Sequence, residues 1–339
     1  MGKISVIIPL YNGRNTLKQT LHSIAMQSII NETEIVIVND CDGVNYEDIL
    51  AKFDDLNIKY VTNSKNRGCA GARNTGIREA SNSIICFIDS DDQFTSSLTL
   101  EIMYNRIKAE GADMLAGAFE SEMRQDNGIA IKKMERSPVW CHNKFYRRQF
   151  LLDNDLFFNE NLRICEDTEF HQLLIDMGGK VAYTPFCGYM WRDNQKSVTH
   201  ESLYKNKWWF VKAVTEYLRE CKERGIGGEK VVHRTLQNLT VCYFYYQIVL
   251  DDTPENKDDY LAACREYWKL ADKYVANVSD EEITRIFLPI MKQQCSLIPS
   301  VTFTEFLERM STSDINKRAL ESLIMCGAFD SLGVYRSRL

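Results

Sequence analysis

Short β-branched runs alternate with amphipathic helical segments over the first hundred residues, and this alternation constrains the fold more than any other feature of the chain. Strands are predicted at 4–9, 34–38, 58–61 and 84–88, and helices at 16–26, 46–53 and 70–80. A strand that is followed by a helix and then by another strand implies crossover connections, which join parallel strands. We therefore predict an α/β domain with a Rossmann-like, mostly parallel sheet and flanking helices.

The chain changes character beyond about residue 200. Segments rich in aromatic and charged residues predict helices at 203–224, 230–250, 257–275 and 280–293. Because an amphipathic helix buries one face, we interpret their aromatic side chains as packing residues. The predicted organisation is an α/β domain over residues 1–202, an α-helical region over 203–300 and a helical tail over 301–339.

Charge and cysteine usage exclude several classes of protein. Lys and Arg number 41 and Asp and Glu number 47, so the net charge of −6 provides no basic field for nucleic acid. The 11 cysteines are scattered without metal-ligand spacing, which argues against a zinc knot and a secreted disulfide scaffold. The longest apolar run, near 241–250, is about half of the roughly 20 residues that a membrane-spanning helix needs. The amino end has too short an apolar stretch for a signal peptide, so we expect a cytoplasmic protein.

Polar residues cluster directly after each predicted strand, at 12, 39–43, 63–68 and 89–92. The carboxyl ends of parallel strands share one edge of an open α/β sheet, and ligands bind at that edge. We therefore expect the functional site there.

The acidic run Asp89-Ser90-Asp91-Asp92 is the densest of these clusters. Carboxylates that lie this close together repel one another, and a divalent cation removes that penalty. Hard oxygen ligands suit Mg²⁺ or Mn²⁺, and such an ion keeps positions open for phosphate oxygens. A solvated acidic turn or a helix cap is the alternative, but a location after a strand at the ligand edge favours a metal site.

Three further segments contain residues that could bind a ligand or take part in catalysis. Asp40 ends the second strand and either binds a base or ribose or caps the following turn. The glycine-spaced segment 66–76 begins a helix, and its N–H groups together with Arg73 suit an anion. It has neither the lysine of a P-loop nor the GxGxxG spacing. The acids at 166–169 either cap a helix or supply a general base, and periodicity does not decide between the two.

The order of these runs closely resembles that of the family 2 inverting glycosyltransferases with the GT-A fold. The runs are VIIPLYN at 6–12, VND at 38–40, NRG at 66–68, ARNTG at 72–76 and DSDD at 89–92. The resemblance continues through WCHNKFYRR at 140–148, EDTEF at 166–170, YMWR at 189–192 and SVTH at 197–200. It covers roughly the first 200 residues and implies a GT-A domain followed by an α-helical region.

The resemblance implies a role for each matched residue. The nucleotide-sugar donor would be bound by Pro9, Tyr11, Asn12, Asp40, Asn66, Gly68, Arg73, Asp89, Ser90 and Asp91. A Mn²⁺ or Mg²⁺ ion would be held by Asp91, Asp89 and His200. Asp167 would be the catalytic base, and Glu166 would help to position the acceptor. Trp191 and Arg192 would close over the acceptor or the pyrophosphate.

The turn after the second strand departs from the family pattern. The family usually has Asp-Asp-Gly-Ser there, and this chain has Asn-Asp-Cys-Asp-Gly at 39–43. Asp40 supplies the carboxylate of the family pattern. The different turn that follows it leaves open how this carboxylate would contact a ribose.

The implied reaction is a metal-dependent, inverting transfer of a hexose from a nucleotide diphosphate donor, with uridine as the favoured base. The acceptor would be a hydroxyl group of a saccharide or lipid-linked saccharide in polysaccharide or glycoconjugate synthesis. Two alternatives remain: a sugar nucleotidyltransferase, and a catalytically inactive GT-A-like module that binds nucleotide or acts as a scaffold. The helical region suits a homodimer or a peripheral contact with the inner face of the cell membrane. We expect no nucleic-acid partner.

The last segment, about residues 314–339, is similar to a short part of the bacterial DNA polymerase III alpha subunit. Leu320, Leu323 and Ile324 followed by Gly327 predict a short amphipathic helix. No polymerase catalytic region accompanies this segment, so we expect no polymerase activity.

Overall fold

The computed structural model describes residues 2–275, together with 279 and 285, apart from 126–127, 135–136, 138, 195–196, 198–199, 201 and 253. The chain divides into two compact units, Met1–His200 and Glu201–Leu339. The first is an α/β unit and the second is helical in its described part. The α/β class with a helical C-terminal region is thus confirmed.

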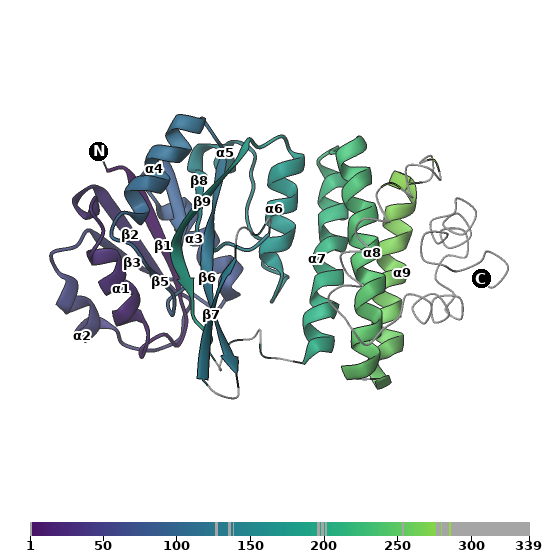
Figure 1. Cartoon of the computed structure of the whole chain (residues 1–339), viewed down its shortest axis with the longest axis horizontal. Helices are drawn as coiled ribbons and strands as arrows, with labels where there is room; N and C mark the ends of the chain where they lie inside the picture. Colours follow the sequence, from purple (N-terminus) through teal and green to yellow (C-terminus); the bar gives the residue numbers. More distant parts are fainter. Residues whose placement is uncertain are drawn as a thin grey trace. The chain divides into compact units, whose positions relative to one another are not determined.

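Four parallel strands form one half of the sheet in the first unit, in the order β3-β2-β1-β4 (Figure 1). They are β1 (Ile4–Leu10), β2 (Thr33–Asn39), β3 (Ile58–Thr62) and β4 (Ile84–Phe87). Every residue of β1, β2 and β4 is buried, as expected for strands that are covered on both faces. All four strands lie where the β-branched runs predict them.

The helices between these strands also follow the sequence prediction. They are α1 (Leu17–Ala25), α2 (Glu47–Leu50) with the 3₁₀ turn Ala51–Phe53, and α3 (Gly68–Glu79). A further 3₁₀ turn, Ile30–Glu32, precedes β2. Helix α1 buries Leu17, Leu21 and Ile24, which share one face at helical spacing. Helix α3 packs so closely on β1 that a Cβ at Gly76 would lie only 2.2 Å from Cγ2 of Ile7, and only glycine fits at this position.

The other half of the sheet makes it mixed. Strand β8 (Lys144–Arg147) pairs antiparallel with β4, and β6 (Met114–Gln125) pairs antiparallel with β8. Strand β9 (Val181–Trp191) pairs parallel with β6 and antiparallel with β5 (Gln93–Phe94). Strand β7 (Gly128–Met134) pairs with β6 alone among the described strands, and the two extend away from the sheet as an arm (Figure 1). The helices of this half are α4 (Thr99–Glu110), α5 (Arg148–Asp153) and α6 (Glu166–Asp176).

The described part of the second unit contains three long helices that run side by side (Figure 1). They are α7 (Leu203–Glu223), α8 (Glu229–Asp252) and α9 (Lys257–Val275), with a 3₁₀ turn at Pro254–Asn256. These three helices match the predictions for 203–224, 230–250 and 257–275. The helix predicted at 280–293 and the tail 301–339, including the polymerase-like segment, lie outside the described residues apart from residue 285. No helix in the described part of the chain has both the length and the apolar character to cross a membrane.

Candidate active site

Arg73 links two distant parts of the first unit at the carboxyl edge of the parallel strands. Its Nη1 donates to Oε1 of Glu166 at 2.6 Å, and its Nη2 donates to Oδ1 of Asp89 at 3.0 Å. Asp89 follows β4, whereas Glu166 is the first residue of α6. The guanidinium is 5% exposed and lies 5.4 Å from the ring centroid of Phe158. One buried cation therefore fixes a carboxylate from the strand edge next to a carboxylate at a helix N-terminus.

Asp167 lies beside Glu166 in the first turn of α6 and is half-buried. Burial is the largest cause that raises the pKa of Asp167, and the charge of Glu166 raises it further, to about 7. The cations Arg73 and Lys144 act in the opposite direction but do not cancel the shift. Burial also raises the pKa of Glu166, although Arg73 opposes this shift. A carboxyl group with a pKa near neutrality is suited to accept a proton during a reaction.

Lys144 lies in β8, is 1% exposed and donates from Nζ to the carbonyl oxygen of Trp140. Burial lowers the pKa of this ammonium group to about 8, while Cys141 and Asp167 raise it. Lys144 is thus a second buried cation that acts on Asp167, and the sequence analysis gave it no role.

Asp40 organises the loop between β3 and α3. Both of its carboxylate oxygens accept the backbone N–H of Arg67, at 3.0 and 2.9 Å, and Oδ1 also accepts Nδ2 of Asn63 at 2.7 Å. Asn66 Oδ1 accepts the backbone N–H of Gly68, which has a φ of +72° and begins α3. Asp40, Asn66 and Gly68 therefore belong to one hydrogen-bonded loop at the strand edge.

Asp42 holds the turns after β1 and β2 together. Its Oδ2 accepts the backbone N–H of Asn12 at 2.8 Å and the hydroxyl of Tyr46 at 2.6 Å. Burial opposes ionisation of Asp42, but the hydrogen bonds from Tyr46, Val44 and Asn12 outweigh it and lower the pKa. Tyr11 beside this turn is 54% exposed, whereas Pro9 is buried within β1. The departure from the family pattern at 39–43 thus supplies a structural carboxylate, Asp42, which the sequence analysis did not single out.

The acidic run after β4 presents its carboxylates in different directions. Asp92 is buried, and it accepts the hydroxyl of Tyr189 at 2.5 Å and the backbone N–H of Arg192 at 2.8 Å. Asp91 accepts Nδ2 of Asn194 at 2.7 Å. Burial and the charge of Asp89 raise the pKa of both Asp91 and Asp92. The run is therefore crowded with negative charge, a condition that a bound cation would relieve.

His142 joins this acidic run, although no spacing in the sequence pointed to it. Ligand atoms of Asp89, Asp92 and His142 all lie within 4.8 Å of one another. The Nδ1 atom of His142 is buried and has no hydrogen-bond partner. Burial lowers the pKa of the imidazole to about 4, so the ring is neutral at pH 7 and keeps a free nitrogen lone pair. Two carboxylates and a neutral imidazole fit a divalent metal ion.

The remaining predicted residues surround this group. Arg192 donates through Nη1 to Oε1 of Gln19 at 2.5 Å, and the ring of Trp191 lies 6.4 Å from that of His142. His200 Nε2 lies 2.6 Å from Oδ1 of Asp193. In the described part of the chain, the structure brings Asp89 into a three-residue group of potential ligands but does not bring Asp91 or His200 into it. The metal-binding roles of Asp91 and His200 stay predictions.

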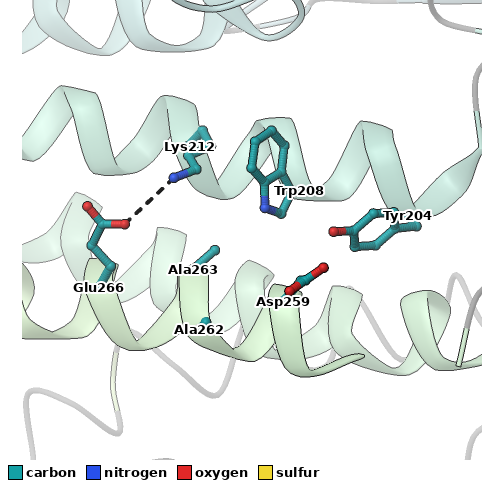
Figure 2. Close-up of a pocket in the computed structure, with 7 residues that line it drawn as sticks. All are labelled: Tyr204, Trp208, Lys212, Asp259, Ala262, Ala263 and Glu266. Atoms are coloured by element: carbon teal, nitrogen blue, oxygen red, sulfur yellow. Dashed lines mark ion pairs between the residues drawn. The ribbon is translucent and has the colours of Figure 1, made fainter. Parts of the chain in front are cut away.

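The helical unit has a separate pocket of about 270 Å³ between α7 and α9 (Figure 2). Its wall includes Tyr204 and Trp208 from α7 and Asp259 from α9. Lys212 Nζ lies 3.7 Å from Oε2 of Glu266 and 5.2 Å from the ring centroid of Trp208. The charges of Lys212 and Glu266 therefore compensate each other within the pocket.

Two family models match this chain. Residues 5–162 match the model described as glycosyl transferase family 2, and residues 273–339 match a helix-hairpin-helix motif. The second match overlaps the polymerase-like segment but does not name a polymerase, so that resemblance stays a prediction.

Two curated relatives are named as a biosynthesis protein and as a glycosyltransferase. The chain is 24% identical over 258 residues to the succinoglycan biosynthesis protein ExoO of Rhizobium meliloti, covering 70% of this chain and 73% of ExoO. It is 30% identical over 187 residues to the poly(ribitol-phosphate) β-N-acetylglucosaminyltransferase TarS of Staphylococcus aureus. That match covers 50% of this chain and 32% of TarS, so the chain spans only about a third of that relative.

Solved structures share the fold. A structure of S. aureus TarS residues 1–349 in complex with UDP superposes with a TM-score of 0.61 at 18% identity, covering 93% of this chain and 94% of that one. The mannosyltransferase PcManGT from Pyrobaculum calidifontis, in complex with GDP-Man and Mn²⁺, gives a TM-score of 0.51 at 12% identity over 98% of this chain and 88% of that one. These likenesses support a GT-A-like fold. The match to the glycosyl transferase family 2 model, which covers residues 5–162 and so a little under half of the chain, agrees with this fold.

Proposed function

We propose that this chain is an inverting glycosyltransferase that moves a sugar from a nucleotide diphosphate donor to a hydroxyl group of a growing polysaccharide or glycoconjugate. The observation that carries the proposal is the bridge from Arg73 to Asp89 and Glu166. This bridge joins the ligand edge of the sheet to the start of α6, where Asp167 has a pKa of about 7. A donor site and a candidate base therefore lie within one cluster of charges.

The proposed donor is a UDP-sugar. TarS has been solved with UDP and with UDP-GlcNAc, and the E. coli relative WfgD is named as a UDP-Glc-dependent glucosyltransferase. In the proposal, the loops around Asp40 and Asn66 bind the base and ribose, with Tyr11 exposed beside them. Ser90 and Asp89 lie at the donor sugar and ribose.

The proposed base is Asp167. It takes the proton of the acceptor hydroxyl while that oxygen attacks the anomeric carbon of the donor sugar. The bond between this carbon and the phosphate oxygen breaks, the nucleoside diphosphate leaves, and the configuration inverts. Glu166, fixed by Arg73, orients the acceptor, and Trp191 and Arg192 cover it.

The carboxylates of the run 89–92 hold a Mn²⁺ or Mg²⁺ ion in this proposal. The donor set fits such an ion because it combines crowded carboxylates with an unpartnered buried imidazole nitrogen. The bound ion would neutralise the charge that develops on the departing diphosphate.

Calorimetric titration with UDP, with and without Mn²⁺, tests the donor site. We expect Mn²⁺-dependent binding to the wild type and its loss in Asp91→Asn. Asp48→Asn is the matched control, because Asp48 is an exposed carboxylate that pairs with Arg14 on the surface. A panel of UDP-sugars with saccharide acceptors then measures release of UDP.

The outcome separates the proposal from its alternatives. Binding of UDP without transfer to any acceptor would favour an inactive nucleotide-binding module. Formation of a sugar nucleotide from a nucleoside triphosphate and a sugar phosphate would favour a nucleotidyltransferase. Failure to bind any of UDP, GDP, CDP and dTDP would contradict a nucleotide-diphosphate donor.

A further inference from the structure

We infer that His142 supplies a nitrogen ligand to the divalent cation, and that Asp89 and Asp92 supply the oxygen ligands beside it. This inference rests on the proposed function, because it concerns the cation of that same site. It gives His142 a metal-binding role that no sequence pattern indicated, and it singles out Asp89 and Asp92 within the acidic run.

The register of two strands places His142 at the acidic run. Strands β4 and β8 pair antiparallel, with Ile84 opposite Arg147 and Cys86 opposite Phe145. Asp89 follows β4 and His142 precedes β8, so the antiparallel pairing brings the two residues to the same end of these strands. The ligand atoms of these two residues and of Asp92 accordingly lie within 4.8 Å of one another. The pairing of β4 and β8 therefore brings these two segments near each other, although Asp89 and His142 themselves lie just outside the strands.

The state of the imidazole suits a ligand. Nδ1 of His142 is a buried polar atom without a hydrogen-bond partner, an arrangement that is unfavourable in a folded protein unless another group satisfies it. A cation held by the two neighbouring carboxylates is such a group.

Aromatic rings fix the orientation of His142. Its ring centroid lies 4.9 Å from that of Phe119 and 5.4 Å from that of Tyr189. The hydroxyl of Tyr189 also donates to Oδ2 of Asp92. Tyr189 therefore positions two of the three inferred ligands, as residues around a metal site commonly do.

The carboxylates keep capacity for a metal. Arg73 donates to Oδ1 of Asp89, and Asp92 takes one donor on each oxygen, from Tyr189 and from the backbone of Arg192. A carboxylate offers about four lone-pair sites, so these bonds orient both groups without saturating them.

A mixed set of oxygen and nitrogen ligands changes the preferred metal. Imidazole suits first-row transition metals, whereas Mg²⁺ prefers oxygen ligands. We therefore expect the full chain with UDP bound to prefer Mn²⁺ over Mg²⁺, and this preference to depend on His142.

Pulsed electron paramagnetic resonance of Mn²⁺ bound to the full chain with UDP tests the inference. We expect modulation from a directly coordinated ¹⁴N nucleus in the wild type. This modulation should be lost in His142→Ala and retained in His200→Ala, the matched variant at the other candidate histidine. Mn²⁺ affinity should fall at least tenfold in His142→Ala, with a smaller change for Mg²⁺.

A second variant guards against a folding defect. His142→Gln keeps a polar side chain with an oxygen ligand at the same position. We expect it to retain cation binding, to lose the nitrogen modulation and to shift the preference towards Mg²⁺.

Several results would overturn the inference. They are nitrogen modulation that persists without His142 or disappears without His200, Mn²⁺ that binds with oxygen coordination alone, and absence of Mn²⁺ binding to the UDP complex. If the chain transfers sugar but Mn²⁺ shows no nitrogen ligand, the inference fails and the proposed function stands. If the nitrogen ligand is present but no sugar is transferred, the proposed function fails and the inference stands.

Discussion

The rate of sugar transfer should depend on pH through the ionisation of Asp167. Burial and the charge of Glu166 raise its pKa from 3.8 to about 7. A general base acts only when deprotonated, so activity is expected to rise with pH through 7 and to be lost below it. At pH 6 about one tenth of the carboxyl groups would be ionised, which gives kcat/KM about tenfold below its plateau. A carboxyl group with the ordinary pKa of 3.8 would give a flat profile over this range.

The assay is release of UDP by the full chain over about pH 5.5–9, a range that brackets an acid limb centred near neutrality. Replacing Asp167 with Asn should lower kcat/KM by about 10²–10⁴-fold and remove the acid limb, while calorimetric binding of UDP is kept. Asp176→Asn, at the opposite end of α6, is the matched control and should leave the profile unchanged. Transfer by Asp167→Asn within tenfold of wild type, with the same acid limb, would refute the assignment of the base.

Three further changes test the electrostatics and packing of the first unit. The raised pKa of Asp167 means that its ionised carboxylate destabilises the folded chain above pH 7. Asp167→Asn should therefore raise the midpoint of thermal unfolding at pH 8 and raise it less at pH 5. A lower midpoint at pH 8 would contradict this. Gly76→Ala should destabilise the chain by about 1–3 kcal/mol, because its Cβ would collide with Ile7. Gly227→Ala is the control: the space around its Cβ position is open, so the midpoint of thermal unfolding should hardly change. Asp40→Asn removes a charged acceptor of a backbone N–H, so we expect the free energy of unfolding to fall by about 1–3 kcal/mol and the binding of UDP in calorimetry to weaken. Unchanged values of both would contradict the structural role of the Asp40 carboxylate.

The parallel half of the sheet was predictable because its signals are local. Strands β1, β2 and β4 are buried β-branched runs, each flanked by polar residues. These features can be recognised in the sequence without knowing which strands pair. The strand ends then indicated Asp40 and the run 89–92 as one edge.

The other half of the sheet depends on pairings that no local pattern reveals. Strand β5 has two residues, β6 contains Ala116-Gly117-Ala118, and β9 contains Pro185, so each gives a weak strand signal. Strand β6 pairs with β9 across more than sixty residues of intervening chain, with Met114 opposite Val181. The predicted edge therefore lacked the residues that this half contributes.

His142 illustrates the consequence for the site. His142 stands in the run 140–148, and no sequence pattern connects it with Asp89, because the two residues meet only through the antiparallel pairing of β4 and β8 beside them. Lys144 was likewise invisible as a buried cation, since a lysine in a sequence is expected on the surface. The sequence marks Glu166 and Asp167 as candidates for either a helix cap or a functional site. The ion pair between Arg73 and Glu166, which only the structure reveals, makes them part of a cluster of charges.

The charges of the site differ between its two sides, and this difference favours an enzyme over a nucleotide-binding scaffold. On the side of the proposed nucleotide site, hydrogen bonds stabilise the carboxylate of Asp42 and lower its pKa. On the side of α6 and the acidic run, burial raises the pKa of Asp91, Asp92 and Asp167, so their ionised forms are penalised by the fold. A module that only holds a nucleotide needs the first arrangement and gains nothing from the second. A general base that takes up a proton near neutral pH needs a raised pKa, so the protein must not fully stabilise its negative charge. Carboxylates that bind a cation need the same, because the cation then supplies the missing positive charge.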